Sequence, residues 1–152
     1  DWEIMKNCCE TLKSFKIDYD VRVISAHRTP KRLDKFVKES EKKGTQVIIA
    51  AAGGAAHLAG VIAAHTTLPV IGIPLDNPPL GGLDALLATV QMPGGVPVAT
   101  VGVGRGGPIN AALTALRILG VSDSEMAAKL DAFVDTQHDR VLDKDAKLQG
   151  LI

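Results

Sequence analysis

Three side chains that could act on a phosphorylated substrate lie within four residues, at Ser25, His27 and Arg28. A hydroxyl and a guanidinium bind phosphate oxygens, and an imidazole gains or loses a proton near neutral pH. Thr29 and Pro30 follow, as an N-cap and a first helical residue would. This run predicts a phosphate-binding turn with a proton carrier. The spacing also fits a plainer alternative, in which Ser25 caps the turn and Arg28 forms a surface ion pair.

A second candidate is the glycine-containing turn Ala51-Ala52-Gly53-Gly54, which precedes His57. Glycines let the backbone approach a ligand, and the amide groups at the start of a following helix favour negative charge. We therefore expect this turn to face a ligand. A histidine in an alanine-rich helix is more often structural, so His57 alone is the weaker of the two histidine candidates.

The remaining histidines, His65 and His138, have no such position, and we expect both to be structural or exposed to solvent. Because no cysteine or carboxylate stands at ligand spacing from any histidine, the sequence predicts no metal site. Asp76 and Asp84 flank a loop rich in proline and glycine and could act as acids. Loop aspartates more often cap turns, however.

The run Gly102-Val103-Gly104-Arg105-Gly106-Gly107 fits the dinucleotide-binding pattern G-x-G-x-x-G. That site needs a second strand that ends in an acidic residue about 20 positions later, whereas here Gly120 leads into more helix. We therefore interpret the run as a turn for close packing or as a backbone wall for a small ligand.

Apolar segments alternate with helical patterns along the chain. Strands this apolar are buried on both faces, which predicts a parallel sheet in a three-layer α/β sandwich. The carboxyl ends of such strands meet at one edge, so the loops 25–30, 51–57, 74–82 and 104–108 should converge. The expected strands are 19–25, 46–51, 69–73 and 96–103, and the expected helices are 2–15, 30–43, 55–66, 83–90, 109–119 and 122–149.

Composition excludes several classes of protein. Seventeen basic and 17 acidic residues give zero formal charge, and aromatic residues make up only 3% of the 152, so nucleic acid is not an expected partner. The length predicts a single domain, 1–152. Cys8 and Cys9 are adjacent and poorly placed to bridge, which favours a reducing, cytoplasmic location. The apolar stretch 47–64 contains Gly53-Gly54, so we expect a strand, turn and helix and no membrane contact.

Four motifs carry a resemblance to a known family. The runs SAHRTP (25–30), AGGAAHLAG (52–60), QMPGGVPVATVGVG (91–104) and NAALTALRIL (110–119) resemble the PurE family of purine biosynthesis, and its bacterial branch most closely. The resemblance implies flavodoxin-like subunits in a homo-octamer, with no cofactor. It also implies the conversion of N5-carboxyaminoimidazole ribonucleotide to 4-carboxy-5-aminoimidazole ribonucleotide, by loss and recapture of carbon dioxide.

The resemblance also implies a role for each matching residue. His27 would be the acid and base, Ser25 and Arg28 would hold the phosphate of the phosphoribosyl aminoimidazole substrate, and Asp1 would contact its ribose. The wall of the carboxylate and carbon dioxide pocket would be formed by Ala52, Gly53, Gly54, His57 and Leu58.

The sequence differs from the family pattern at one place. The first strand and the Gly-Ser-x-Ser segment that precede the equivalent of Asp1 are missing, so the sheet should lack one strand. Two alternatives stay open. One is direct carboxylation of aminoimidazole ribonucleotide, and the other is a non-catalytic flavodoxin-like module that binds a phosphorylated ligand or FMN.

Overall fold

The computed structural model describes residues 1–151, which form two compact units, Asp1–Ala115 and a second that begins at Leu116. The secondary structure alternates between helices and short strands, as the sequence predicts. In chain order, the elements are α1 (Trp2–Ser14), α2 (Pro30–Lys42), β1 (Ile48–Ala52), α3 (Leu58–Ala63), β2 (Val70–Pro74), α4 (Leu83–Val90), β3 (Ala99–Thr100), α5 (Gly106–Gly120) and α6 (Ser124–Gln149).

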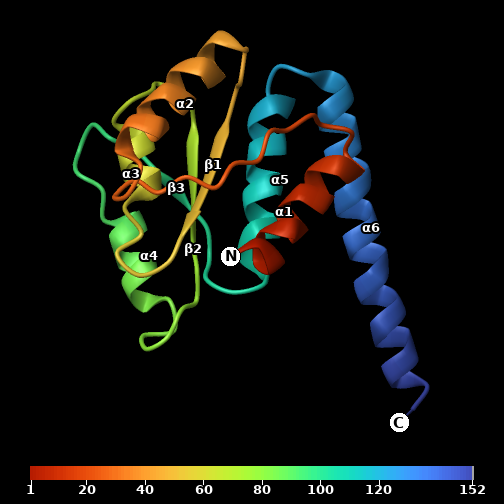
Figure 1. Ribbon diagram of the computed structural model, residues 1–152. Helices are drawn as coiled ribbons and strands as arrows, with labels where there is room; N and C mark the ends of the chain where they lie inside the picture. Colours follow the sequence, from red (N-terminus) through yellow and green to blue (C-terminus); the bar gives the residue numbers. More distant parts are fainter. Residues whose placement is uncertain (152) are drawn as a thin grey trace. The chain divides into compact units, whose positions relative to one another are not determined.

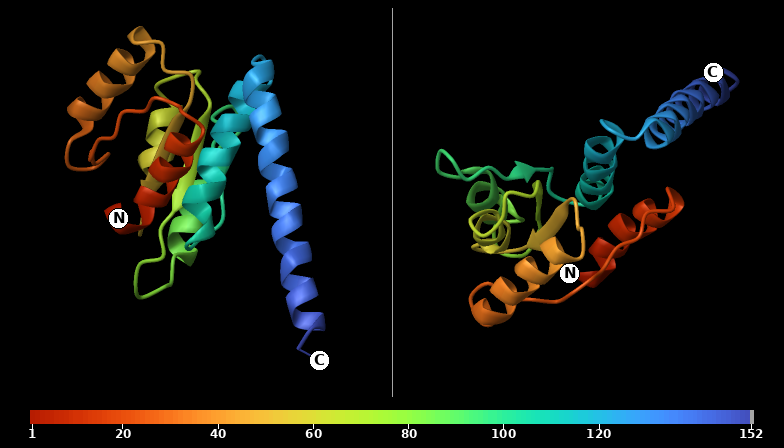
Figure 2. Two further views of the ribbon diagram at one scale, coloured as in Figure 1. Left: turned by 90° about the vertical axis from the view of Figure 1, so that its right-hand side faces the viewer. Right: turned by 90° about the horizontal axis from the view of Figure 1, so that it is seen from above.

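The first unit is built on a parallel sheet with the strand order β1-β2-β3. Strand β2 is buried along its whole length, as expected for a central strand covered on both faces. Helices α2, α3 and α4 lie on one side of the sheet, and α1 and the α5 residues of this unit lie on the other (Figures 1 and 2). This arrangement confirms the predicted α/β sandwich.

The core between the sheet and α2 follows from apolar residues at helical and strand spacing. Leu33 and Val37, one helical turn apart on α2, are almost completely buried. They pack with Ile48 and Ala50, which alternate toward the same face of β1. The stretch 47–64 thus forms a strand, a turn and a helix, and no helix within residues 1–151 is long and apolar enough to cross a membrane.

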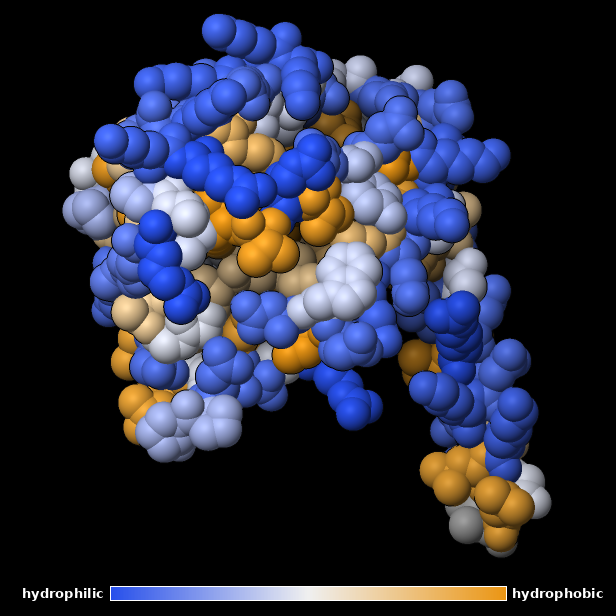
Figure 3. Space-filling model, viewed as in Figure 1, coloured by the Kyte–Doolittle hydropathy of each residue, from blue (hydrophilic) through white to orange (hydrophobic). Residues whose placement is uncertain are grey.

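The predicted strand 19–25 is wrong, because this segment forms no strand and belongs to no sheet. Within the described chain, the backbone groups of Val21 and Val23 have no strand beside them, and Val23 is 92% exposed. The segment reaches the core only at its end, through Ile24 and through Ala26, which follows the segment. A strand needs a neighbour for its hydrogen-bond ladder, and the sheet formed by residues 1–151 places none beside this segment. In Figure 3 apolar side chains gather below α2, where the segment crosses.

Several boundaries differ from the predictions: β1 begins at Ile48 and not at 46, and α5 begins at Gly106 and not at 109. Strand β3 spans only Ala99–Thr100 instead of 96–103, and Pro97 lies just before it, where a residue without an N–H cannot extend the ladder. Helix α3 begins at Leu58 and not at 55, because residues 53–57 form a turn in which Ala56 has a left-handed backbone.

The second unit consists mainly of α6, the predicted long C-terminal helix. Asp123 caps it: its Oδ1 accepts hydrogen bonds from the backbone N–H of Glu125 at 2.9 Å and of Met126 at 3.1 Å. With this cap, α6 starts at Ser124, two residues after its predicted start. Most of the helix is exposed and carries charged side chains, such as the pair Lys129 and Glu125.

Gly72 provides a test of packing at the centre of the sheet. A Cβ atom added there would overlap Thr89 Cγ2 and lie 3.0 Å from Val98 Cγ1. We expect Gly72→Ala to lower the free energy of unfolding by about 1–3 kcal/mol, because the core must shift to admit the methyl group. Gly94→Ala is the control, since a Cβ there meets nothing within 4 Å. Urea denaturation of both variants measures the difference, and equal midpoints would contradict this account.

The cysteines provide a test of burial. Both are free, and burial raises the pKa of the Cys8 thiol from 9.0 to about 12. We therefore expect no alkylation of Cys8 by iodoacetamide at pH 8 until the chain is unfolded. The folded state keeps this proton where the unfolded chain releases it, so stability should fall as the pH rises from about 9 toward 12. Peptide mapping after alkylation checks the first result, and labelling at the unfolded rate would contradict it.

Candidate active site

The ends of β1 and β2 bring two of the predicted loops together. Ala52 pairs with Pro74 in the parallel register, and the backbone N–H of Leu75 donates to the carbonyl of Ala52 at 3.0 Å. Beyond this point Gly53 begins the glycine turn, and a Cβ added to it would overlap the side-chain amide of Asn77. The loop after β2 therefore lies directly against the turn after β1, as the sheet topology predicts.

The turn that carries His27 is closed by Ser25 and Thr29. The carbonyl of Ser25 accepts hydrogen bonds from both the N–H and the hydroxyl of Thr29, each at 2.9 Å. The Thr29 hydroxyl oxygen in turn accepts a bond from the N–H of Ser25 at 3.0 Å. These bonds fix the backbone on both sides of His27 and Arg28, whose side chains are exposed. The rigid turn therefore presents an imidazole and a guanidinium to solvent.

His27 and His57 meet although they are 30 residues apart in the chain. His27 Nε2 lies 2.8 Å from His57 Nδ1, and the two rings are perpendicular with centroids 4.9 Å apart. This distance is that of a hydrogen bond, in which one nitrogen donates and the other accepts. The structure therefore brings together the two candidate histidines that the sequence could rank only separately.

The backbone before His57 is held in an unusual conformation. Ala56 has a φ of +44°, is buried, and donates its N–H to the carbonyl of Gly53 at 3.2 Å. A residue with a side chain rarely adopts this left-handed conformation, and such strained positions cluster at functional sites. His57 then caps α3, where the N–H of Val61 donates to its carbonyl at 2.9 Å. The tight turn thus fixes where the His57 ring can point.

The plainer interpretation of residues 25–28 has two parts, and the structure supports the first and contradicts the second. Ser25 does cap the turn, since its Oγ accepts a bond from the N–H of Arg28 at 3.1 Å. Arg28, in contrast, forms no ion pair with any residue in the range 1–151. The guanidinium is therefore free to bind an anion, and the Ser25 hydroxyl retains its proton as a donor.

The positions of Asp1 and Leu58 neither support nor contradict their predicted roles. Asp1 is exposed at the start of α1, where its carbonyl accepts bonds from Ile4 and Met5, and no contact within the described chain joins its side chain to the histidine pair. Leu58 is half-buried and packs against the core. The predicted roles of both residues stay predictions.

Asn77 lies against the glycine turn of the candidate site, and the sequence analysis did not single it out. Its side chain covers Gly53, which only a glycine permits. The signal that could have located it is its position in the proline-rich and glycine-rich loop that follows a buried strand. In the G-x-G-x-x-G run, Gly107 serves packing, because a Cβ there would overlap the carbonyl of Gly102, whereas a Cβ at Gly102, Gly104 or Gly106 would meet nothing within 4 Å.

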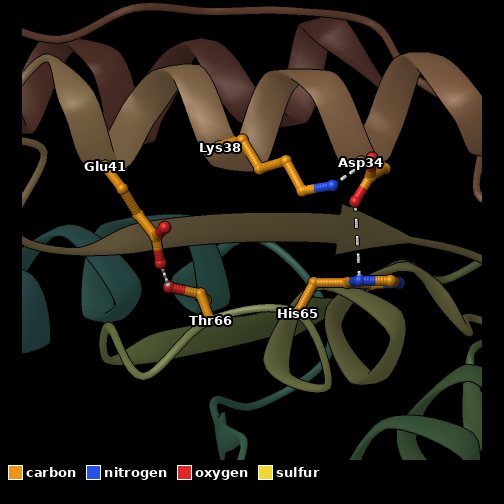
Figure 4. A network of polar contacts seen from close by, with 5 residues as sticks. All are labelled: Asp34, Lys38, Glu41, His65 and Thr66. Atoms are coloured by element: carbon orange, nitrogen blue, oxygen red, sulfur yellow. Dashed lines mark hydrogen bonds and ion pairs between the residues drawn. The ribbon is translucent and has the colours of Figure 1, made fainter.

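The other histidines lie in exposed polar contacts. His65 Nδ1 is 3.7 Å from Asp34 Oδ1, and Lys38 donates to the same carboxylate at 2.8 Å (Figure 4). Glu41 and Thr66 make a second contact between the same two segments. His138 faces its neighbour Asp139. Both histidines therefore have the solvent-facing positions that were expected, and no group of three potential metal ligands gathers anywhere in residues 1–151.

A recess of about 250 Å³ lies between α2 and the segment before it, and its lining includes Arg22, Arg32 and Phe36. None of the predicted site residues lines it. The candidate site is instead an exposed surface formed by two turns and a loop.

Comparison with known proteins identifies the family. A family model described as AIR carboxylase matches residues 1–140. An N5-carboxyaminoimidazole ribonucleotide mutase from Saccharolobus solfataricus is 55% identical over 142 residues, which cover 93% of this chain and 89% of that protein. A protein of the same name from Bacillus subtilis is 47% identical over 148 residues and covers 97% of this chain and 91% of its own.

A solved structure agrees with these matches. The crystal structure of Treponema denticola PurE superimposes with a TM-score of 0.88 and 28% sequence identity, and covers 97% of this chain and 91% of that one. This chain therefore belongs to the AIR carboxylase (PurE) family, as its four sequence motifs predicted.

Proposed function

We propose that this protein converts N5-carboxyaminoimidazole ribonucleotide to 4-carboxy-5-aminoimidazole ribonucleotide, a mutase reaction of purine biosynthesis. The observation that carries the proposal is the position of His27: a proton carrier held at 2.8 Å from His57, beside a glycine turn and an unpaired guanidinium. The names of the relatives from two organisms support the same activity. The alternative of direct carboxylation is not favoured, because these two relatives, which match this chain over most of their own length, carry the mutase name.

The chemistry moves one carboxylate within the substrate. When the bond between the exocyclic nitrogen and the carboxylate carbon breaks, its electron pair stays on nitrogen, which takes up a proton, and carbon dioxide is released. Carbon 4 of the ring then attacks the retained carbon dioxide, and loss of the carbon-4 proton restores the aromatic ring. One proton is taken up and one is given back. A single acid and base such as His27 is therefore sufficient, and no cofactor is needed.

The remaining residues would bind and orient the substrate. Arg28 and the Ser25 hydroxyl would hold the phosphate, and Asp1 would contact the ribose. The backbone of Ala52 and Gly53 would stabilise the carboxylate oxygens. Gly54, His57 and Leu58 would complete the wall that retains carbon dioxide, because loss of the gas to solvent would abort the reaction.

Because the site is exposed in a single chain, we propose that other copies help to enclose it. Helix α4 and the loop before it expose four large apolar side chains: Leu80, Leu83, Leu87 and Val90 are 48–58% exposed. Three of them lie on one helical face, which is the pattern of a helix that packs against a partner. The number of copies, eight, rests on the family resemblance alone. The two buried free cysteines fit a cytoplasmic location.

The proposed activity is tested by comparing two substrates. The protein should turn over N5-carboxyaminoimidazole ribonucleotide rapidly and should turn over aminoimidazole ribonucleotide with bicarbonate slowly. His27→Asn should bind the first substrate with little change in affinity but lose about 10²–10⁴ in kcat, because asparagine cannot carry the proton. Preference for the bicarbonate reaction would reject the mutase, and unchanged turnover of His27→Asn would remove His27 from the chemistry.

Arg28 should act in binding and not in the chemical step. We expect Arg28→Ala to raise KM by about tenfold or more with a smaller change in kcat, because a charge-assisted bond to phosphate is lost. The matched control is Arg22→Ala, since Arg22 pairs with Asp20 at 2.6 Å and is given no role in binding. Steady-state kinetics of both variants check this, and equal KM values would exclude Arg28 as the phosphate ligand.

A further inference from the structure

We propose that His57 shares the catalytic proton with His27, so that the two rings act as one unit that holds a single extra proton. The inference rests on the proposed function, which gives His27 a proton to move, and on the contact between His27 Nε2 and His57 Nδ1 at 2.8 Å. In this account His27 acts on the substrate, and His57 is a positioning residue that acts through it.

The hydrogen bond constrains the protons that the pair can carry. When both rings are neutral, one proton lies between them, and each ring has one outer nitrogen. The donor in the bond then has a lone pair on its outer nitrogen, and the acceptor has its proton there. If both rings become cationic, both facing nitrogens carry a proton and the bond is lost. The bonded pair therefore holds either no extra proton or one.

This constraint matches the proton balance of the reaction. In the first half the pair, loaded with one extra proton, delivers it to the exocyclic nitrogen as the carbon–nitrogen bond breaks. The pair is then neutral and keeps its hydrogen bond. In the second half it takes the proton from carbon 4 and returns to its starting state. After the first half His27 donates its Nε2–H to Nδ1 of His57 and has a lone pair on its own Nδ1, so the same nitrogen can take the proton from carbon 4.

Few charged groups compete with this arrangement. Strand β1 and helix α3 carry no titratable side chain, so neither element that flanks His57 adds a charge. The charged residues closest in the chain to the two turns and the loop after β2 are Arg28, Lys31 and Arg32 in the first turn of α2, Asp76 in the loop, and Asp84 in the first turn of α4. The rest of α2 carries further charges, such as Asp34, which pairs with Lys38. Within residues 1–151 none of these side chains contacts either ring of the pair. Within residues 1–151, the side-chain contact of each imidazole is therefore with the other imidazole.

The test replaces His57 by asparagine, whose amide can take the place of Nδ1 in a hydrogen bond but cannot accept a second proton. The wild-type profile of kcat/KM against pH should be bell-shaped, falling when the pair is doubly protonated and when it has no extra proton. His57→Asn should lose the acidic limb and about tenfold or more in kcat, with KM changed by less than about twofold. A merely structural role would leave the shape of the profile unchanged, which would overturn the proposal.

His65→Asn is the matched control, because His65 is an exposed histidine whose contact is with Asp34. Its profile should equal the wild-type profile. The ring signals of the wild-type protein, followed by NMR without substrate, separate this proposal from the proposed function. Two rings that share a proton titrate as a pair in two coupled steps. Independent titration would overturn the shared proton even if the enzyme is active, and coupled titration would support it even if the activity proves different.

Discussion

The hydrogen bond between two exposed imidazoles, His27 and His57, forms only if the rest of the first unit holds both rings in place. Exposed side chains have no packing around them to hold their position, so their geometry must come from the backbone. The Ser25–Thr29 closure provides it on one side and the left-handed Ala56 on the other. The 2.8 Å contact would be lost if one turn moved without the other.

The sheet is what places the two turns within reach of each other. Parallel pairing of Ala52 with Pro74 fixes the position of the glycine turn at the edge of the sheet. Packing of Leu33 and Val37 on the face of β1 fixes the position of α2, and so of the turn before it, beside the same strand. Gly72 permits the close packing at the centre, because a methyl group there would displace Thr89. Tight packing in the core thus fixes the distance between two side chains at the surface.

The sequence was most informative where a residue type has one strong physical preference. Apolar strands and amphipathic helices predicted the α/β sandwich, and Thr29-Pro30 predicted the start of α2 at the observed residue. The predictions failed where the conformation depends on a distant neighbour. Residues 19–25 have the composition of a strand, but the part of the chain that the structure describes offers them no strand to pair with. Helix α3 starts later than predicted because Ala56 adopts a conformation that alanine does not favour. The contacts of His57 with His27 and of Asn77 with Gly53 could not be predicted, since no local pattern encodes them.

The hydrogen bond itself can be measured directly. In protein labelled with ¹⁵N in its histidines, magnetisation passes between two nitrogens only when a hydrogen bond joins them. At neutral pH we predict a scalar coupling between Nε2 of His27 and Nδ1 of His57, which is lost when acid protonates both rings. The absence of this coupling at every pH would contradict the account, because the two turns would then present separate histidines.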